Sequence, residues 1–348
     1  MGSMAFWYEK NSNTAGAQLD AVMNFNLWTQ CDTSSASFLD IGFKISGISA
    51  ARKLYYYIPF AGISVDDLSL KINKSKAIGA IFNEKYSVID ISDSNHFWPI
   101  RDDVNNSIAF VIYSWNNDSG DSAVQVIQKG YRDGVCLEID VDKLRRHVVS
   151  IPNAQFTEND VFYFRFRIQI PGPKQSNTIV RKYTPPNSFL QSTLATTYIV
   201  DFRFDDLRSL PEAISSKIVT PNTDFVPVSK LHFLMMTKAH VDVETGARDI
   251  SLRELEDETW DNYIDNKFDT KDVVAYHCAE KARKEHPPIK QWEFFAKVKV
   301  NNSTWQVVIV YLLVLAVITI IFNLASSFLW EWICSFFPGG LFVPKPGA

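Results

Sequence analysis

The run His240, Asp242 and Glu244 is the first group of residues in this 348-residue sequence whose types and spacing could do chemistry. In an extended strand the three side chains project to one side, where they could offer three ligands to a metal ion. A solvated strand face has the same pattern, and no second His or Cys lies at ligand spacing. We therefore expect a solvated face and no metal.

A second group is the adjacent pair Asp205 and Asp206, which resembles a paired catalytic carboxylate. The neighbouring Arg208 and the proline that follows are more typical of a turn. The sequence also lacks G-x-S-x-G, H-E-x-x-H and a phosphate-cradling glycine loop. We expect no enzyme and no cofactor, and keep as an alternative a membrane-tethered hydrolase that uses this pair or the His240 run.

A third group combines aromatic and basic side chains on and near the segment 161–170. Such side chains on one sheet face can stack on bases and neutralise phosphates, as in the recognition of nucleotides or single-stranded nucleic acid. Arginines paired with carboxylates across strands have the same pattern. The segment lacks the glycines of an RNA-recognition motif. The candidate ligand-binding residues are Tyr163, Arg165, Arg167, Arg181, Lys182, Tyr183 and Arg203.

A long apolar segment near the C-terminus predicts a transmembrane helix over 303–337. No charged residue occurs from Ser303 to Trp330, and about 20 apolar residues suffice to cross a hydrocarbon core. The tryptophans at its two ends are typical of interfacial aromatic belts. They are Trp305 on one side and Trp330 and Trp332 on the other.

Polar residues in the second half of this helix are the fourth group. At 100° per residue they form one stripe, composed of Thr319, Asn323, Ser326 and Ser327, with Glu331 near the interface. Ser and Thr can bond to carbonyls one turn back. Asn323 lies roughly 10 Å inside Trp330 and needs a partner helix or water. We expect a homo-oligomer, with four copies as the working number, whose stripe makes either a helix contact or a pore. A tolerated Asn323 without any role is the third alternative.

The distribution of charge predicts the orientation of this helix. Basic residues gather before it, whereas Lys345 alone follows it, so the large domain is expected in the cytoplasm. We expect a single-pass protein of the bacterial inner membrane, with the N-terminus inside and a short exterior tail at 338–348. The net charge of −4 gives no global attraction to nucleic acid, and four scattered cysteines suggest neither disulfides nor a cysteine zinc site.

The first 250 residues predict a β-rich cytosolic domain. The clearest strand is 161–170, where Phe162, Phe164 and Phe166 alternate with polar residues. Turn-rich links join the strands, as in an antiparallel β-sandwich, and one large sandwich is favoured over two small ones. The other expected strands are 38–45, 53–60, 85–91, 107–115, 123–128, 134–141, 196–204 and 230–236.

The segment 251–302 is expected to be a short helical neck. Ser251 and Glu254 form a capping box that predicts a helix over 251–265. The spacing of 273–286, with basic residues in its last turn and two prolines after it, predicts a second helix. A further helix is expected to begin at Ser64.

In its layout the chain resembles the membrane effectors of bacterial anti-phage defence, such as channel-type effectors of nucleotide-second-messenger systems or of the Hailong system. The resemblance covers the whole chain and rests on architecture, without a diagnostic motif. It implies a self-associating cytosolic domain whose nucleotide or oligonucleotide ligand controls a bundle of transmembrane helices that depolarises the cell. A tail-anchored scaffold that recruits a cytosolic partner, such as an enzyme, is the alternative.

Overall fold

The structure is a computed structural model of the whole chain. It describes residues 2–301 and 305–336, apart from gaps at 13, 15–16, 32–36, 75–76, 83, 90–95, 116–120, 129–133, 152–155, 158, 176, 185–194, 247–248, 256–259, 261–262, 265–267 and 283–287. The chain divides into two compact units, each described by itself. The first, the β-rich body, comprises 1–184 and 197–300, and the second comprises 185–196 and 301–348.

A large sheet runs through the β-rich body. Most neighbouring strands are antiparallel, but β15 pairs in parallel with β2, and β11 with β8. In spatial order its strands are β17 (Ser251–Glu254), β18 (Val273–Lys281), β15 (Val228–Lys238), β2 (Asp20–Trp28), β3 (Phe38–Ser46), β11 (Phe162–Gln169), β8 (Ser107–Tyr113), β7 (Phe97–Asp102) and β6 (Tyr86–Val88), with β5 (Val65–Asp67) paired to β11.

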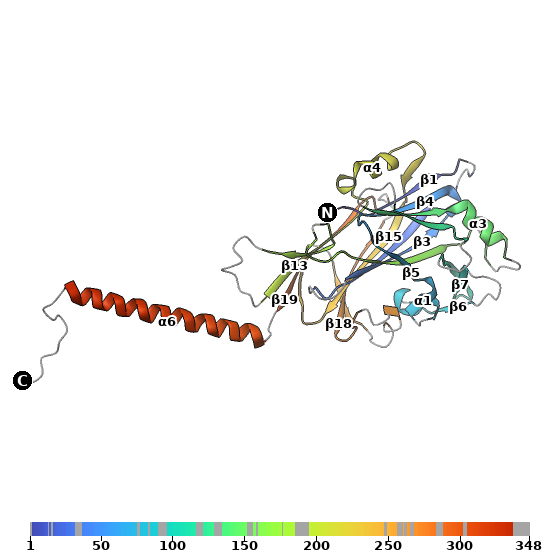
Figure 1. The fold of residues 1–348 in the computed structure, drawn as a ribbon. Helices are drawn as coiled ribbons and strands as arrows, with labels where there is room; N and C mark the ends of the chain where they lie inside the picture. The colour runs from blue at the N-terminus through green and yellow to red at the C-terminus, as the bar shows by residue number, and fades with distance from the viewer. Residues whose placement is uncertain are drawn as a thin grey trace, which may run out of the picture. The chain divides into compact units, whose positions relative to one another are not determined.

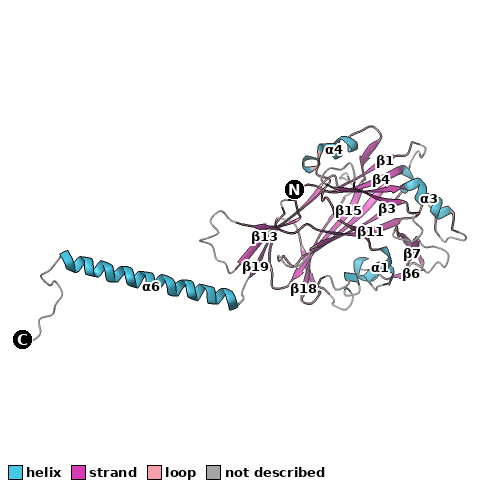
Figure 2. Cartoon of the chain, in the orientation of Figure 1, coloured by secondary structure: helices cyan, strands magenta, loops and turns pink. Residues whose placement is uncertain are grey.

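Two smaller sheets complete the described β structure. The five-stranded sheet has the order β14 (Thr223–Phe225), β1 (Ala5–Lys10), β4 (Ala51–Ile58), β10 (Val135–Asp140) and β9 (Val124–Ile127). The four-stranded sheet has the order β12 (Val180–Tyr183), β13 (Ala195–Phe204), β19 (Trp292–Asn301) and β16 (Asp242–Thr245). Figure 2 shows how strands dominate the body.

Both smaller sheets pack on the same face of the large sheet. Phe43 of β3 contacts Phe6 of β1, with ring centroids 4.9 Å apart, and Phe25 of β2 contacts Phe202 of β13 at 4.8 Å. Because side chains alternate along a strand, every second residue of β2 and β3 enters this main core. The remaining residues of the same strands face the opposite side of the sheet.

Short helices cover the outer faces, as Figure 1 shows. On the side opposite the main core, a second cluster packs Trp28 and Phe110 against residues such as Ile78 of α2 and Trp260. The helices of the body are α1 (Ser69–Lys74), α2 (Ala77–Phe82), α3 (Val141–Val149) and α4 (Glu212–Ile218), with 3₁₀ turns η1 (Ile48–Ala50) and η2 (Leu207–Ser209). In α3 the carboxylate of Asp140 caps the N-terminus by accepting from Lys143 N–H at 2.8 Å.

The second unit contains one long helix, α6 (Trp305–Phe336). Its segment Tyr311–Phe336 is long and apolar enough to cross a membrane. This confirms the predicted apolar helix. The predicted exterior tail, 338–348, lies outside the described residues.

The nine strands expected from the sequence are all present, and the fold is mainly β as predicted. The helix expected at 273–286 is wrong, because residues 273–281 form β18 in full register with β15. Val273, Ala275 and Cys278 are buried there. Strand pairing on both sides of the segment has overridden its helical spacing.

The rest of the helical neck also needs correction. Residues 251–254 of the expected capping-box helix form β17, and 292–301 form β19, so β structure continues to residue 301. Alternate residues of β19 are buried, a period of two that the sequence carries in WEFFAKVKV. The helix expected at Ser64 starts instead at Ser69, whose N–H is capped by the Asp67 carboxylate at 2.9 Å.

We predict that Gly42→Ala destabilises the body. A Cβ at this position of β3 would overlap Tyr163 Oη and lie 3.1 Å from Arg165 Nη1. Overpacking of this kind costs about 1–3 kcal/mol. The apparent unfolding temperature of the full-length protein in detergent measures the change. Gly172→Ala is the control, because no atom lies within 4 Å of the added Cβ. Equal unfolding temperatures for the two variants would contradict this prediction.

Candidate functional site

The His240 run lies on and beside β16, at the edge of the four-stranded sheet. Glu244 is opposite Lys297 and forms an ion pair at 3.5 Å, and Asp242 is opposite Lys299. His240 belongs to the exposed turn before the strand. Within the part of the chain that the structure describes, no group of three His, Cys, Asp or Glu side chains could hold a metal ion.

Asp205 and Asp206 point to different partners. Asp205 is buried with a positive φ of 54°, and its Oδ1 accepts from Phe6 N–H at 2.8 Å. Burial raises the pKa of this carboxyl well above its usual value. Asp206 instead accepts from Arg208 Nε at 3.0 Å and Ser209 Oγ at 2.8 Å. Both contacts are those of a tight turn that caps η2.

The polar face predicted on β11 is buried beneath the second cluster. Arg167 makes a two-pronged bond to Asp40 of β3, its partner in register: Nε donates to Oδ1 at 2.6 Å and Nη2 to Oδ2 at 3.0 Å. Tyr263 Oη and Trp28 Nε1 also donate to Asp40 Oδ2, at 2.9 and 3.1 Å. Asp40 is fully buried, and its two oxygens accept four hydrogen bonds.

Arg165 is fully buried next to this group. Its Nε donates to Tyr263 Oη at 2.5 Å and its Nη1 to Tyr163 Oη at 2.9 Å, while Nη2 lies 3.9 Å from Asp40 Oδ2. Hydrogen bonding orients the Asn26 amide so that its oxygen accepts from Arg165 Nη2 at 2.8 Å. Two guanidinium groups thus share one carboxylate, which leaves one positive charge in excess among these residues.

The other predicted ligand-binding residues lie elsewhere. Arg181, Lys182 and Tyr183 belong to β12, in the four-stranded sheet. Arg203 of β13 binds Asp201 through two nitrogens, each at 3.1 Å. The structure therefore does not bring the seven residues together. Ligand binding by them stays a prediction.

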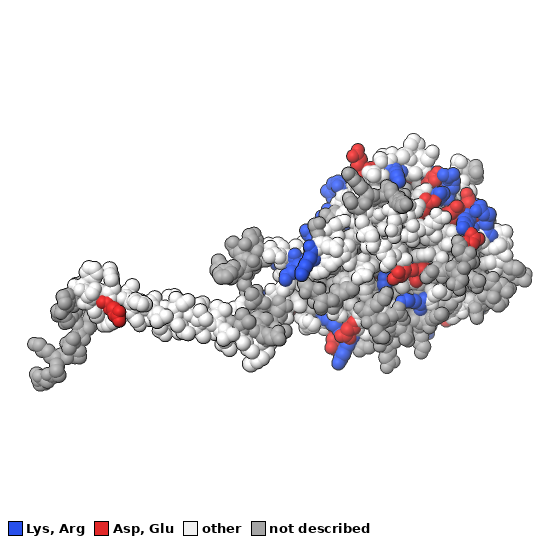
Figure 3. Space-filling view, viewed as in Figure 1, with Lys and Arg blue, Asp and Glu red and all other residues white. Residues whose placement is uncertain are grey.

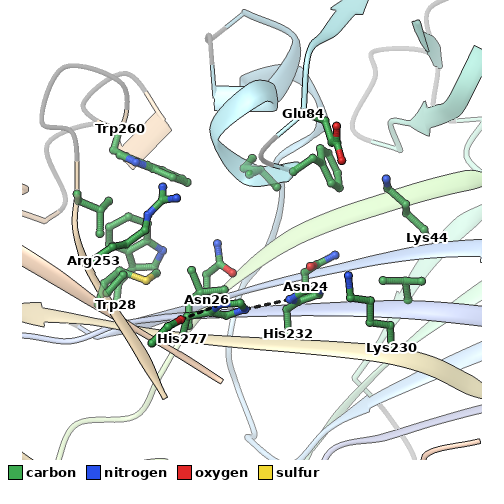
Figure 4. Close-up of a pocket in the computed structure, with 18 of the residues that line it drawn as sticks. Asn24, Asn26, Trp28, Lys44, Glu84, Lys230, His232, Arg253, Trp260 and His277 are labelled. Carbon is green, nitrogen blue, oxygen red and sulfur yellow. Dashed lines mark hydrogen bonds between the residues drawn. The ribbon is translucent and has the colours of Figure 1, made fainter. Parts of the chain in front are cut away.

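A cavity of about 390 Å³ lies on the face of the large sheet opposite the main core, and we call it the sheet-face cavity. Four neighbouring strands supply its floor, because the residues that alternate with core residues point into it. Side chains from α2 and from residues 84, 86, 255 and 260 form its walls. The labelled floor residues in Figure 4 are Asn24, Asn26 and Trp28 of β2, Lys230 and His232 of β15, and His277 of β18.

Positive charges dominate the sheet-face cavity. Lys44, Lys230 and Arg253 oppose Glu84 among the described lining residues, an excess of two positive charges. The Lys44 ammonium lies over the rings of Phe82 and Phe110, 4.1 and 4.0 Å from their centroids. Burial lowers the pKa of Lys44 to about 8, against the attraction of Glu84, and the Lys230 charge adds to the lowering.

Two stacked imidazoles occupy the middle of the floor. His232 Nδ1 and His277 Nε2 are 3.0 Å apart, so one donates to the other, and the ring planes differ by 12°. Burial, together with the charge of Lys230 and the neighbouring His277, lowers the pKa of His232 to about 4. Burial also lowers the pKa of His277. Both rings are neutral at pH 7. His277 Nδ1 lies 3.4 Å from Ser251 Oγ, so among the described residues His232 Nε2 is the imidazole nitrogen that is left for a ligand.

Sequence reasoning found the strand 230–236 but not this cavity. The sequence pattern that could have revealed the polar floor is the presence of polar residues at alternate positions of apolar strands. These residues are Asn24 and Asn26 in DAVMNFNLW, and Lys230 and His232 in KLHFLMM. A period of two identifies such a face but not what covers it. The cover comes from segments far away in sequence.

Helix α6 carries the predicted polar stripe on a fully exposed surface. Thr319 Oγ1 donates to Leu315 O at 2.8 Å, and the hydroxyls of Ser326 and Ser327 donate to Asn323 O at 3.1 and 2.9 Å. These groups satisfy themselves, as expected. The Asn323 side-chain amide has no hydrogen-bond partner in the described chain. Figure 3 shows α6 almost without charge, with acidic colour only near its C-terminal end, where Glu331 lies.

Comparisons with known proteins gave matches among solved structures and none among family models or curated proteins. Among solved structures, an M1 zinc metallopeptidase from Deinococcus radiodurans covers 84% of this chain at 9% identity, with a TM-score of 0.29. A mutant of it bound to a Tyr-Ser-Ala substrate has 10% identity, 81% coverage and a TM-score of 0.26. This chain spans 43% and 42% of those two chains.

We predict that Asp40→Asn destabilises the body strongly. Loss of the carboxylate charge leaves Arg165 and Arg167 buried without a counter-ion, which costs about 3–5 kcal/mol in such pairs. Chemical unfolding of the full-length protein, followed by tryptophan fluorescence, measures the change. Asp224→Asn is the matched control: its carboxylate is exposed and lies 3.7 Å from Lys10. The control should change stability by less than about 1 kcal/mol, and a similar loss in both variants would refute the role of Asp40.

We also predict that His232 makes stability depend on pH. Its pKa is about 4 in the folded protein and about 6.5 when unfolded. Between these values the unfolded chain binds more protons, so stability should fall as the pH falls from about 6.5 to about 4. His232→Gln should reduce that fall in a thermal unfolding series. His240→Gln, in the exposed turn before β16, should keep the wild-type profile, and an unchanged profile in His232→Gln would count against this assignment.

Proposed function

We propose that the protein is an oligomeric membrane effector of anti-phage defence. In this proposal the β-rich body lies in the bacterial cytoplasm and binds an intracellular ligand, a nucleotide or oligonucleotide. Several copies of α6 span the inner membrane, with the C-terminus outside, and together form a pore that the ligand controls. An open pore depolarises the infected cell.

The observation that carries this proposal is the isolated amide of Asn323. In hydrocarbon an unsatisfied polar group costs free energy, and such groups turn towards protein or water. The neighbouring Thr319, Ser326 and Ser327 bond to their own helix, but within the described chain Asn323 does not. A second copy of α6, or water in a pore between copies, supplies the missing partner.

Control of the pore follows from linkage. A ligand that binds one arrangement of the oligomer more tightly than another shifts the population towards that arrangement, and with it the packing of the α6 bundle. In the open bundle Thr319 and Asn323 lie near the constriction. A ring of Glu331 carboxylates lies near the outer mouth, where it favours cations.

We predict that Asn323→Leu abolishes ion flux. The substitution removes the polar group that lines or holds the bundle, while an apolar residue remains compatible with lipid. Membrane depolarisation in expressing cells, and ion release from liposomes that contain the purified protein, measure the effect.

Ala325→Leu is the matched control, because it introduces the same side chain 200° around the helix, on the opposite face. It should conduct like the wild type. If the Asn323→Leu variant conducts normally, α6 is an anchor only. The pore hypothesis is then replaced by the alternative, a scaffold that recruits a cytosolic partner.

A further inference from the structure

We propose that the sheet-face cavity binds one nucleoside phosphate unit, with its phosphate between Lys44 and Lys230 and its base over the polar floor of the cavity. This inference rests on the proposed function in that it locates the ligand of the sensing body. The residues differ from those that the sequence suggested, which lie on the neighbouring strand β11 or in another sheet.

The charge of the cavity points to an anion. Lys44 and Lys230 lie at one end of the view in Figure 4, and Arg253 and Trp260 at the other, with the two asparagines and two histidines between them. Beside this floor, on the same face of the sheet, Arg165 bonds to Asn26, so the buried excess charge of the Arg165, Arg167 and Asp40 group lies next to the cavity. An anion in the cavity would relieve the repulsion among these cations.

The surroundings of Lys44 leave its charge available for the phosphate of a ligand, because no carboxylate of the described lining residues is paired with it. Its ammonium lies over two adjacent aromatic rings, and it forms no ion pair with Glu84, the acidic residue among the described lining residues. Cation–π contacts hold the charge in place without neutralising it. Lys44 is therefore held ready for an anion that enters from outside.

The remaining lining suits a planar heterocycle. Asn24 and Nε2 of His232 offer hydrogen-bonding groups from the floor, and Phe82 and Leu234 offer apolar surface. Trp260, which is 5% exposed, adds the apolar surface of its indole ring to the wall.

The size of the cavity limits the ligand to one such unit. Its volume of about 390 Å³ lies towards the lower end of the range of small-molecule sites. Two sources share this chemistry: a free mononucleotide, or the phosphorylated end of an oligonucleotide whose other residues stay outside.

Calorimetric titration of the full-length protein in detergent tests the inference. The probes are the four nucleoside 5′-monophosphates, the four unphosphorylated nucleosides, inorganic phosphate, and short single-stranded oligonucleotides with and without a 5′-phosphate. We expect at least one monophosphate or 5′-phosphorylated oligonucleotide to bind, and to bind at least tenfold more tightly than its unphosphorylated counterpart and than inorganic phosphate. Binding by the oligonucleotide alone identifies the strand end as the source.

The variants Lys44→Met and Lys230→Met keep the apolar stems and remove the charges, and each should weaken binding roughly 10- to 100-fold. Lys297→Met, on β19 of the four-stranded sheet, is the control and should bind like the wild type. Unfolding temperatures establish that the variants are folded. Absence of binding by every probe, or equal affinity in both cavity variants and the wild type, overturns the inference.

The same titration keeps the inference distinct from the proposed pore. Binding that depends on Lys44 and Lys230, in a protein that never conducts, leaves the site standing and removes the pore. Ligand-controlled ion flux that is unchanged in both cavity variants supports the pore and overturns the proposed binding site.

Discussion

The structure of the β-rich body depends on the sharing of Asp40 by Arg165 and Arg167. All three side chains lie on the face of the large sheet opposite its main core, where their charges are buried. Asp40 also accepts hydrogen bonds from Trp28 and from Tyr263. One carboxylate thereby joins the centre of the sheet to the aromatic cluster that covers it. Trp28 and Tyr263 in turn contact Trp260, which belongs to the wall of the cavity.

This shared carboxylate also gives the cavity its character. A buried charge is tolerated only when it is paired and hydrogen-bonded, and here the pairing leaves one positive charge over. Arg165 donates a hydrogen bond to Asn26, one of the floor residues, so this excess charge lies beside the cavity. Helix α6 also carries a polar group that is not satisfied, because the side-chain amide of Asn323 has no hydrogen-bond partner among the described residues. In our account the excess positive charge attracts an anionic ligand, and the Asn323 amide attracts further copies of the chain.

The parts of the fold that the sequence predicted are those with local signals. Alternating Phe residues identified β11, and an uncharged run identified α6. Residues 273–281 misled because Val274, Ala275, Cys278 and Ala279 have the spacing of one helix face, and only pairing with β15 decides between helix and strand. The role of Arg165 was also beyond sequence reasoning, because burial under Tyr263, 98 residues away, turns an apparent surface arginine into a buried one.

The mass of the full-length protein purified in mild detergent tests the central claim most directly, because both the proposed pore and the role of Asn323 require association of chains. Light scattering corrected for bound detergent, or native mass spectrometry, gives the protein mass of the complex. The account predicts a discrete closed oligomer, with four 348-residue chains as the working number. A particle that contains a single chain at all protein concentrations would contradict it.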